Sequence, residues 1–235
     1  CLTGCRSVGG FCSRMGLSFG VIGAANRSER WKRVKILNLY AGIGGNRKLW
    51  GPEHEVTAVE YDEQIAAVYA DLFPQDELVI GDAHEYLRQH HGQFDFIWSS
   101  PPCQTHSSFR YNIGVRFRGV EEKFPDMTLY EEIVFLKYHS EALWVVENVV
   151  PYYEPLIPAK KINRHLYWSN FDIPDHELIV ENLRSSQIPD LQVLHDYDLS
   201  AYSLPNKRQV LRNCVHRETG LHVLEAALDA LEAVE

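Results

Sequence analysis

The sequence predicts an α/β fold with a doubly wound, mostly parallel sheet, because short apolar segments alternate five times with segments of helical spacing. Right-handed crossovers place the carboxyl ends of parallel strands along one edge of such a sheet. Side chains that follow the strands are therefore expected to lie together. The predicted strands are residues 34–40, 55–60, 77–80, 94–98 and 142–146, and the predicted helical segments are residues 46–50, 62–73, 84–90 and 129–138.

The second half of the chain is less regular. Residues 107–126 show no period and are predicted as a long loop, while 166–168 and 171–173 are candidate strands. Residues 174–205 are polar and 221–234 form a candidate terminal helix. We divide the chain into an extension (1–30), a catalytic and cofactor-binding domain (31–168), a short segment (169–205) and a terminal part that packs back on that domain (206–235).

Composition places the chain among globular proteins, with 45% hydrophobic and 23% charged residues. The net charge of −9 gives no overall sign of nucleic-acid binding, although basic residues cluster locally after position 103. Five cysteines without metal-ligand spacing predict neither a metal site nor a disulfide framework, and favour the cytoplasm. No apolar run is long enough for a membrane span, and the Gly- and Ser-rich residues 1–30 make a poor signal peptide.

Several chemically useful features follow successive predicted strands. A glycine-rich turn (41–45) would let a ligand approach the backbone closely. Glu60 is placed to accept hydrogen bonds from ribose hydroxyls, or is simply solvated. Asp82 could accept from an exocyclic amine, or only cap the next helix. Together they predict a site for a nucleoside without phosphates, and S-adenosylmethionine fits.

Cys103 follows the fourth predicted strand and two prolines. The prolines stiffen the backbone, so the thiol is held in one place at a sheet edge where ligands bind. A thiol there is a candidate nucleophile, and the alternative is a small buried hydrophobic residue.

The motifs, in their order and spacing, resemble those of DNA cytosine-5 methyltransferases, specifically compact phage or bacterial members. The resemblance covers residues 34–216. It rests on Ala41-Gly42-Ile43-Gly44-Gly45, Glu60, Asp82, Pro101-Pro102-Cys103-Gln104, Glu147-Asn148-Val149, Arg164-His165-Leu166-Tyr167-Trp168 and Arg208-Gln209-Val210-Leu211-Arg212-Asn213.

The resemblance implies transfer of a methyl group from S-adenosyl-L-methionine to C5 of a cytosine flipped out of double-stranded DNA. Cys103 would attack C6, Glu147 would protonate N3, and Arg164 would hold O2. It implies cofactor contacts by Tyr40, Ala41, Gly42, Ile43, Gly44, Gly45, Glu60, Tyr61, Asp82, Ala83, Pro101 and Asn213, with Trp98 beside the adenine. It implies DNA contacts by Gln104, Ser107, Arg110, Arg116, Arg118 and His165, and support of the site by Pro102 and Asn148.

Two departures from the family pattern bear on function. The family usually has two arginines separated by one residue, whereas Asn163-Arg164-His165 offers one, so the O2 contact falls to Arg164 or His165. Only 38 residues separate Trp168 from Lys207, where the family usually inserts a larger target-recognition domain. We therefore assign target recognition to 169–205 and expect a short recognition sequence.

Other functions are open at this stage. One is a tRNA cytosine-5 methyltransferase of the same family, although its Cys-Phe-Thr signature is missing. Another is a catalytically silent DNA-binding relative, and a third is a nicotinamide-dependent oxidoreductase, which the missing third glycine disfavours. We expect a cytoplasmic monomer of a prokaryotic or phage-infected cell, within or outside a restriction-modification pair.

Overall fold

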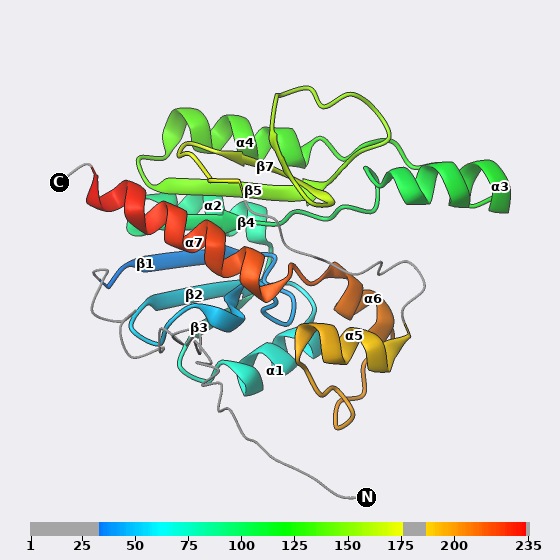
Figure 1. Cartoon of the computed structure of the whole chain (residues 1–235), viewed down its shortest axis with the longest axis horizontal. Coiled ribbons are helices and arrows are strands. Elements are labelled where there is room, and N and C mark those ends of the chain that lie inside the picture. Colours follow the sequence, from blue (N-terminus) through cyan, green and yellow to red (C-terminus); the bar gives the residue numbers. More distant parts are fainter. Residues whose placement is uncertain (1–32, 176–186, 234–235) are drawn as a thin grey trace, which may run out of the picture.

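The structure is a computed structural model that describes residues 33–175 and 187–233. Its centre is a seven-stranded sheet of order β3-β2-β1-β4-β5-β7-β6 (Figure 1). The strands β1 (Lys35–Leu39), β2 (Glu55–Glu60), β3 (Glu77–Ile80), β4 (Phe96–Ser99) and β5 (Leu143–Val149) run parallel. The predicted doubly wound, mostly parallel sheet is confirmed.

The order of the strands creates a switch point between β1 and β4. From β1 the chain proceeds outward through β2 and β3, then returns to form β4 and β5 on the other side of β1. Open α/β sheets bind ligands outside the carboxyl ends of the strands at such a point. The turn after β1 and the turn that carries Cys103 after β4 meet here.

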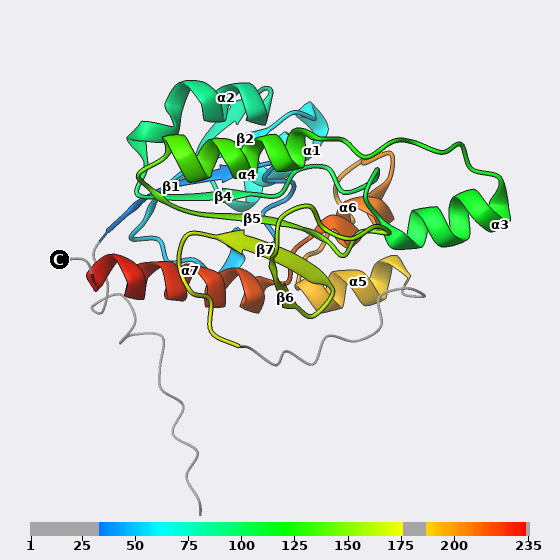
Figure 2. The ribbon, with the colours of Figure 1, turned by 90° about the horizontal axis from the view of Figure 1, so that it is seen from above.

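Helices cover both faces of the sheet, which explains why its central strands are almost entirely apolar. On one face, α2 (Ala83–His90) and α4 (Thr128–His139) bury Leu87, Ile133 and Leu136 against β1, β4 and β5. On the opposite face, α7 (Arg217–Glu232) buries Val223 and Leu224 (Figure 2).

Helix starts are fixed by side chains that the sequence places before them. Asp62 caps α1 (Glu63–Leu72) by accepting from the backbone N–H groups of Gln64 and Ile65. Asp82 caps α2 by accepting from the N–H group of Glu85 at 2.9 Å. Each cap occupies one of the free N–H groups that begin a helix. Asp82 thus performs the capping role that the sequence had left as one alternative.

Antiparallel strands and short helices complete the chain. β7 (His165–Ser169) pairs with β5, and β6 (Lys160–Ile162) pairs with β7. α5 (Ile188–His195) and α6 (Lys207–Asn213) pack with α1, where Leu191, Leu211 and Val68 share one apolar cluster. Two 3₁₀ turns, η2 (Arg47–Leu49) and η3 (His91–Gln93), link larger elements.

Several local predictions were wrong. Residues 171–173 form no strand, β6 was missed, and α5 lies in the stretch read as irregular. Glu147 and Asn148 belong to β5 itself, because the pairing with β7 extends this strand beyond its apolar part. The extension 1–30 lies outside the described residues, and the division into domains stays a prediction.

The segment predicted as a loop contains helix. Residues Arg110–Val115 form a π-helix (η4) that continues into α3 (Arg116–Arg118). None of these residues is buried, so no apolar face marks the period in the sequence. We call residues 109–124 the arm, because its helix projects away from the sheet in both views (Figures 1 and 2).

No helix among residues 33–175 and 187–233 is long and apolar enough to cross a bilayer. Within the same ranges, no group of three or more histidine, cysteine, aspartate or glutamate side chains is arranged to hold a metal ion.

Candidate active site

A cavity of about 520 Å³ lies at the carboxyl edge of the sheet, at the switch point. We call it the main cavity. It gathers predicted residues from β1, β2, α2, the Cys103 turn, β5, β7 and α6. These are Tyr40, Ala41, Gly42, Ile43, Gly45, Glu60, Tyr61, Asp82, Ala83, Pro101, Pro102, Cys103, Gln104, Glu147, Asn148, His165 and Asn213.

The glycine turn and Glu60 form one wall of the main cavity. Gly42 has a φ of +57°, and a Cβ atom built on it would meet no atom within 4 Å, so its backbone is open to a ligand. Its N–H group donates to the Glu60 carboxylate at 2.8 Å. The second Glu60 oxygen accepts from the N–H group of Asp62 at 3.0 Å. These bonds hold the carboxylate against the turn at the cavity wall.

The Cys103 turn is anchored to β5 by Asn148. The buried Asn148 amide donates to the carbonyl of Pro101 at 2.9 Å, and its oxygen accepts from the N–H group of Val149 at 2.9 Å. The Cys103 carbonyl accepts from the N–H groups of His106 and Ser107. These bonds hold the backbone of the turn that carries the thiol, in addition to the two prolines.

Cys103 and Glu147 interact electrostatically in this cavity. Burial raises the pKa of the Cys103 thiol from its usual 9.0 to about 11, and the negative charge of Glu147 adds to the rise. The thiol is thus protonated at neutral pH. Glu147 is 6% exposed and pairs with Nδ1 of His165 at 3.1 Å. A change that neutralises Glu147 would make the thiolate easier to form.

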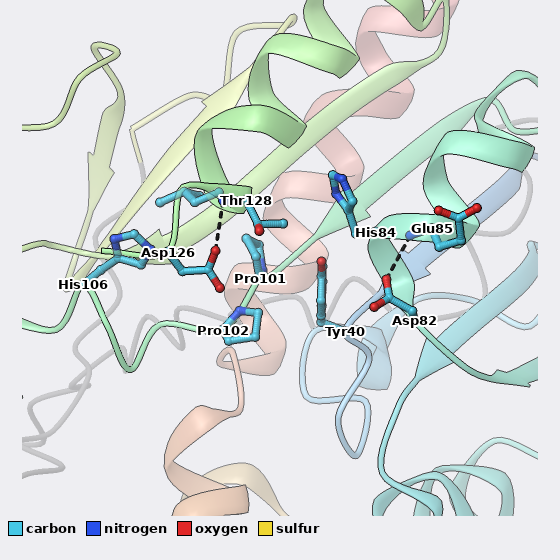
Figure 3. A pocket seen from close by; sticks show the side chains of 10 residues that line it. Tyr40, Asp82, His84, Glu85, Pro101, Pro102, His106, Asp126 and Thr128 are labelled. Atoms are coloured by element: carbon cyan, nitrogen blue, oxygen red, sulfur yellow. Dashed lines mark hydrogen bonds between the residues drawn. The ribbon is translucent and has the colours of Figure 1, made fainter. Parts of the chain in front are cut away.

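A second cavity of about 330 Å³ adjoins the main one and shares Tyr40, Asp82 and the two prolines with it. Figure 3 shows Tyr40 with His84 above it in this view, Asp82 on one flank and Asp126 on the other. Asp126 accepts from the N–H group of Thr128 at 3.1 Å. We call this cavity the polar recess. It is lined by Tyr40, Asp82, His84, Glu85, Pro101, Pro102, His106, Asp126, Thr128 and Leu129.

Some predicted residues lie elsewhere. Arg164 lines a separate, smaller cavity with His195 and His216, while its neighbour His165 reaches the main cavity. Trp98, expected beside the adenine, is fully buried in the core and forms no part of the cavity wall. That expectation was wrong, because Trp98 faces the α7 side of β4.

Gly44 and four predicted DNA contacts also lie outside the main cavity. Gly44 packs against Phe73, since a Cβ there would come within 2.3 Å of the ring. Ser107 accepts from the N–H group of Arg110 at 3.3 Å. Arg110, Arg116 and Arg118 are carried by the arm.

The sequence reasoning missed several wall residues. Arg212 belongs to the last motif of the family resemblance, but no role was predicted for it. Its guanidinium lies 5.8 Å from the ring centre of Phe109. The local basic clustering could have indicated it. The other missed residues carry no distinctive signal in one sequence: Asn46, Ile65, Ser100, Val149, Val210, Cys214 and Val215.

Comparison with known proteins places the chain in a class of enzyme. Residues 34–149 match the family model for C-5 cytosine-specific DNA methylase. This range contains the glycine turn, Glu60, Asp82, Cys103 and Glu147. This part of the chain, just under half of its length, therefore matches a family of methyltransferases, and the methyl donor is S-adenosyl-L-methionine, as predicted.

Solved structures are similar to the chain over about half of its length. The Escherichia coli protein yhhF shares 18% identity over 60% of this chain and 76% of its own, with a TM-score of 0.38. A Spodoptera frugiperda DNMT2 mutant shares 24% identity over 49% of this chain and 35% of its own, with a TM-score of 0.34. No curated protein matches the sequence. The family assignment rests on the family model.

Proposed function

We propose that the protein is a DNA cytosine-5 methyltransferase that works through a covalent bond between Cys103 and C6 of a flipped-out cytosine. The observation that carries the proposal is that Cys103 and Glu147 line the same cavity as Gly42 and Glu60. The reaction needs a nucleophile, an acid and a nucleoside-binding wall in one place.

The residues present fit the cofactor. Gly42 leaves its backbone open, and the Glu60 carboxylate is placed to accept from ribose hydroxyls. Asp82, where the two cavities meet, is placed to accept from the adenine amine beside the Tyr40 ring. Asn213, at the end of α6, would lie at the methionine end. When bound, the cofactor supplies the methyl group.

The chemistry of the base then falls to Cys103 and Glu147. The Cys103 thiolate forms a bond to C6, the electron pair of the C5–C6 bond moves through the ring toward N3, and protonated Glu147 donates its proton to N3. The ring thereby becomes nucleophilic at C5. After C5 is methylated, N3 returns its proton to Glu147 and the C5 proton leaves to a base. The electron pair of that C–H bond restores the C5–C6 double bond, and the sulfur departs as the thiolate.

The same geometry explains how a thiol with a raised pKa can react. The charged form of Glu147 contributes to that raised pKa, whereas its protonated form does not. The protonated form of Glu147, which donates to N3, therefore also makes the Cys103 thiolate easier to form. His165, 3.1 Å from Glu147, holds that carboxyl in place and is the group in the main cavity best placed to contact O2.

Nucleic-acid binding is proposed for the arm. It carries three arginines next to the Cys103 turn, and such side chains neutralise backbone phosphates. The segment 169–205 is short, so we propose a short recognition sequence in double-stranded DNA.

The experiment is transfer of a tritiated methyl group from S-adenosyl-L-methionine to duplex DNA and, separately, to tRNA. The proposal expects labelled 5-methylcytosine in DNA and loss of transfer in Cys103→Ala. Preferred labelling of tRNA would establish the RNA alternative. Binding of DNA without any transfer would establish a catalytically silent protein.

A further inference from the structure

A buried carboxylate lies beneath the polar recess. Glu132, on α4, is fully buried. Its Oε1 accepts from the Tyr40 hydroxyl at 2.5 Å and lies 3.2 Å from Nδ1 of His84. Its Oε2 accepts from the Ser99 hydroxyl at 2.5 Å. One carboxylate thus joins three elements, the turn after β1, the start of α2 and the end of β4.

A buried charge is expensive, and it is retained where its partners are satisfied and their positions matter. Burial and Glu132 together raise the pKa of Tyr40, so its hydroxyl stays protonated and donates. The hydrogen bond to Glu132 raises the pKa of His84, which favours the protonated ring beside the carboxylate. The network therefore surrounds the Glu132 carboxylate with two hydroxyl donors and one histidine.

Both hydroxyl donors stand at critical places in the site. Tyr40 forms part of the wall of both cavities, and its backbone has a φ of 55°, an unfavourable conformation for a residue with a side chain. Ser99 is the last residue of β4, two positions before Pro101. Glu132 therefore joins the wall that faces the cofactor to the last residue of β4.

We propose that Glu132 is a positioning residue for the cofactor site, acting through the Tyr40 hydroxyl. The inference rests on the proposed cofactor placement, in which the adenine lies beside the Tyr40 ring. Without the carboxylate, the Tyr40 ring loses the hydrogen bond that fixes its position, although the backbone of Tyr40 keeps its unfavourable conformation. Cofactor affinity then falls because part of the binding free energy is used to order Tyr40.

The test uses isothermal titration calorimetry of the full chain with S-adenosylhomocysteine. Glu132→Gln keeps the shape of the side chain and removes its charge, and Tyr40→Phe keeps the ring and removes the hydroxyl. The matched control is Glu131→Gln, one position earlier on α4, whose 58% exposed side chain contacts His84 and Arg88. Thermal unfolding shows which variants are folded.

We expect Kd to rise about tenfold in Glu132→Gln and in Tyr40→Phe, within the range of one charge-assisted hydrogen bond, and to stay within about twofold in Glu131→Gln. The double variant should bind no more weakly than Glu132→Gln alone, because both changes remove the same bond. KM for the cofactor should rise with the Kd while kcat at saturating cofactor stays within about twofold, a division that general loss of structure would not produce.

A folded Glu132→Gln protein with the wild-type Kd would overturn the inference. If Glu132→Gln does not fold, a wild-type Kd in Tyr40→Phe would overturn it equally. A Glu131→Gln protein weakened as much as Glu132→Gln would show that only the charge of α4 matters. Absence of binding by the wild-type protein would contradict the cofactor placement itself, and the inference with it.

Discussion

The main cavity and the arm are adjacent in sequence but differ in how they are built. In the cavity, Cys103 and Asn148 lie on a turn and a strand fixed by buried hydrogen bonds. In the arm, the helix has no buried residue, Phe117 on α3 is 79% exposed, and Phe124, beyond the end of α3, is 87% exposed. One contact between the two regions is that of the Arg212 guanidinium, in the cavity wall, with the ring of Phe109, the first residue of the arm.

The difference indicates a division of labour. Reacting groups must be held within a fraction of an ångström, which needs a packed frame. Groups that bind the phosphates of a nucleic acid need positive charge and an exposed position, and a projecting basic segment provides both. Changes in the cavity should therefore affect chemistry, and changes in the arm should affect nucleic-acid affinity.

The largest expected effect is that of Cys103→Ala. Without the sulfur no bond to C6 forms, so methyl transfer should fall by at least ~10³-fold. Cofactor binding should stay within about twofold, since Glu60 and Asp82 are unchanged. Rates of tritium transfer and calorimetric Kd values check this. Residual transfer above about one tenth of the wild-type rate would rule out the covalent route.

In the arm, the double change Arg116→Ala and Arg118→Ala should weaken binding of duplex DNA about tenfold at moderate salt. The slope of log K against log salt is negative and should become shallower by about 1.8, for two lost phosphate contacts. Fluorescence anisotropy at several salt concentrations measures both. The control is Lys137→Ala, an exposed cation in the last turn of α4, which should change neither value. An unchanged slope in the double variant would contradict the role of the arm.

A third comparison uses two asparagines that fix opposite ends of β5. Asn148→Ala removes the bond to Pro101, and Asn170→Ala removes the bonds to Trp144 and Ala142. Each change leaves a backbone group without its partner, the Pro101 carbonyl in one case and the Trp144 N–H group in the other. Because such a loss lowers the free energy of unfolding by about 1–3 kcal/mol, Tm should fall by several degrees. Only Asn148→Ala should also lower kcat, because only that bond holds the Cys103 turn. Equal kcat values in the two variants would show that the bond to Pro101 has no catalytic role.

The smallest effect concerns the thiol itself. Because burial raises the pKa of Cys103 to about 11, its alkylation by iodoacetamide should keep accelerating as pH rises from 7 to about 11. Glu147→Gln removes the negative charge that adds to this rise, so the pKa should fall and alkylation at pH 9 should become faster. Mass spectrometry of the Cys103 peptide measures the rate. Slower alkylation in Glu147→Gln would contradict the electrostatic coupling.

The same contrast explains what the sequence could predict. Buried parallel strands leave apolar runs, and the residues after them meet at one edge, so Glu60, Asp82 and Cys103 could be placed together from their positions alone. The arm helix buries nothing, so it leaves no periodic signal in the sequence. Glu132 could not be recognised, because a glutamate in a helix normally faces solvent. Its role depends on Tyr40, 92 residues away.

The most direct test of the account is covalent trapping on a duplex whose target cytosines carry fluorine at C5. A base can remove a proton from C5 but cannot remove fluorine as a cation. Because the sulfur departs only after that step, the bond between Cys103 and C6 should persist after methylation. In the presence of S-adenosyl-L-methionine, mass spectrometry should find the nucleotide attached to the peptide containing Cys103. Methylation of ordinary duplex DNA without any trapped adduct, or an adduct at another residue, would contradict the mechanism.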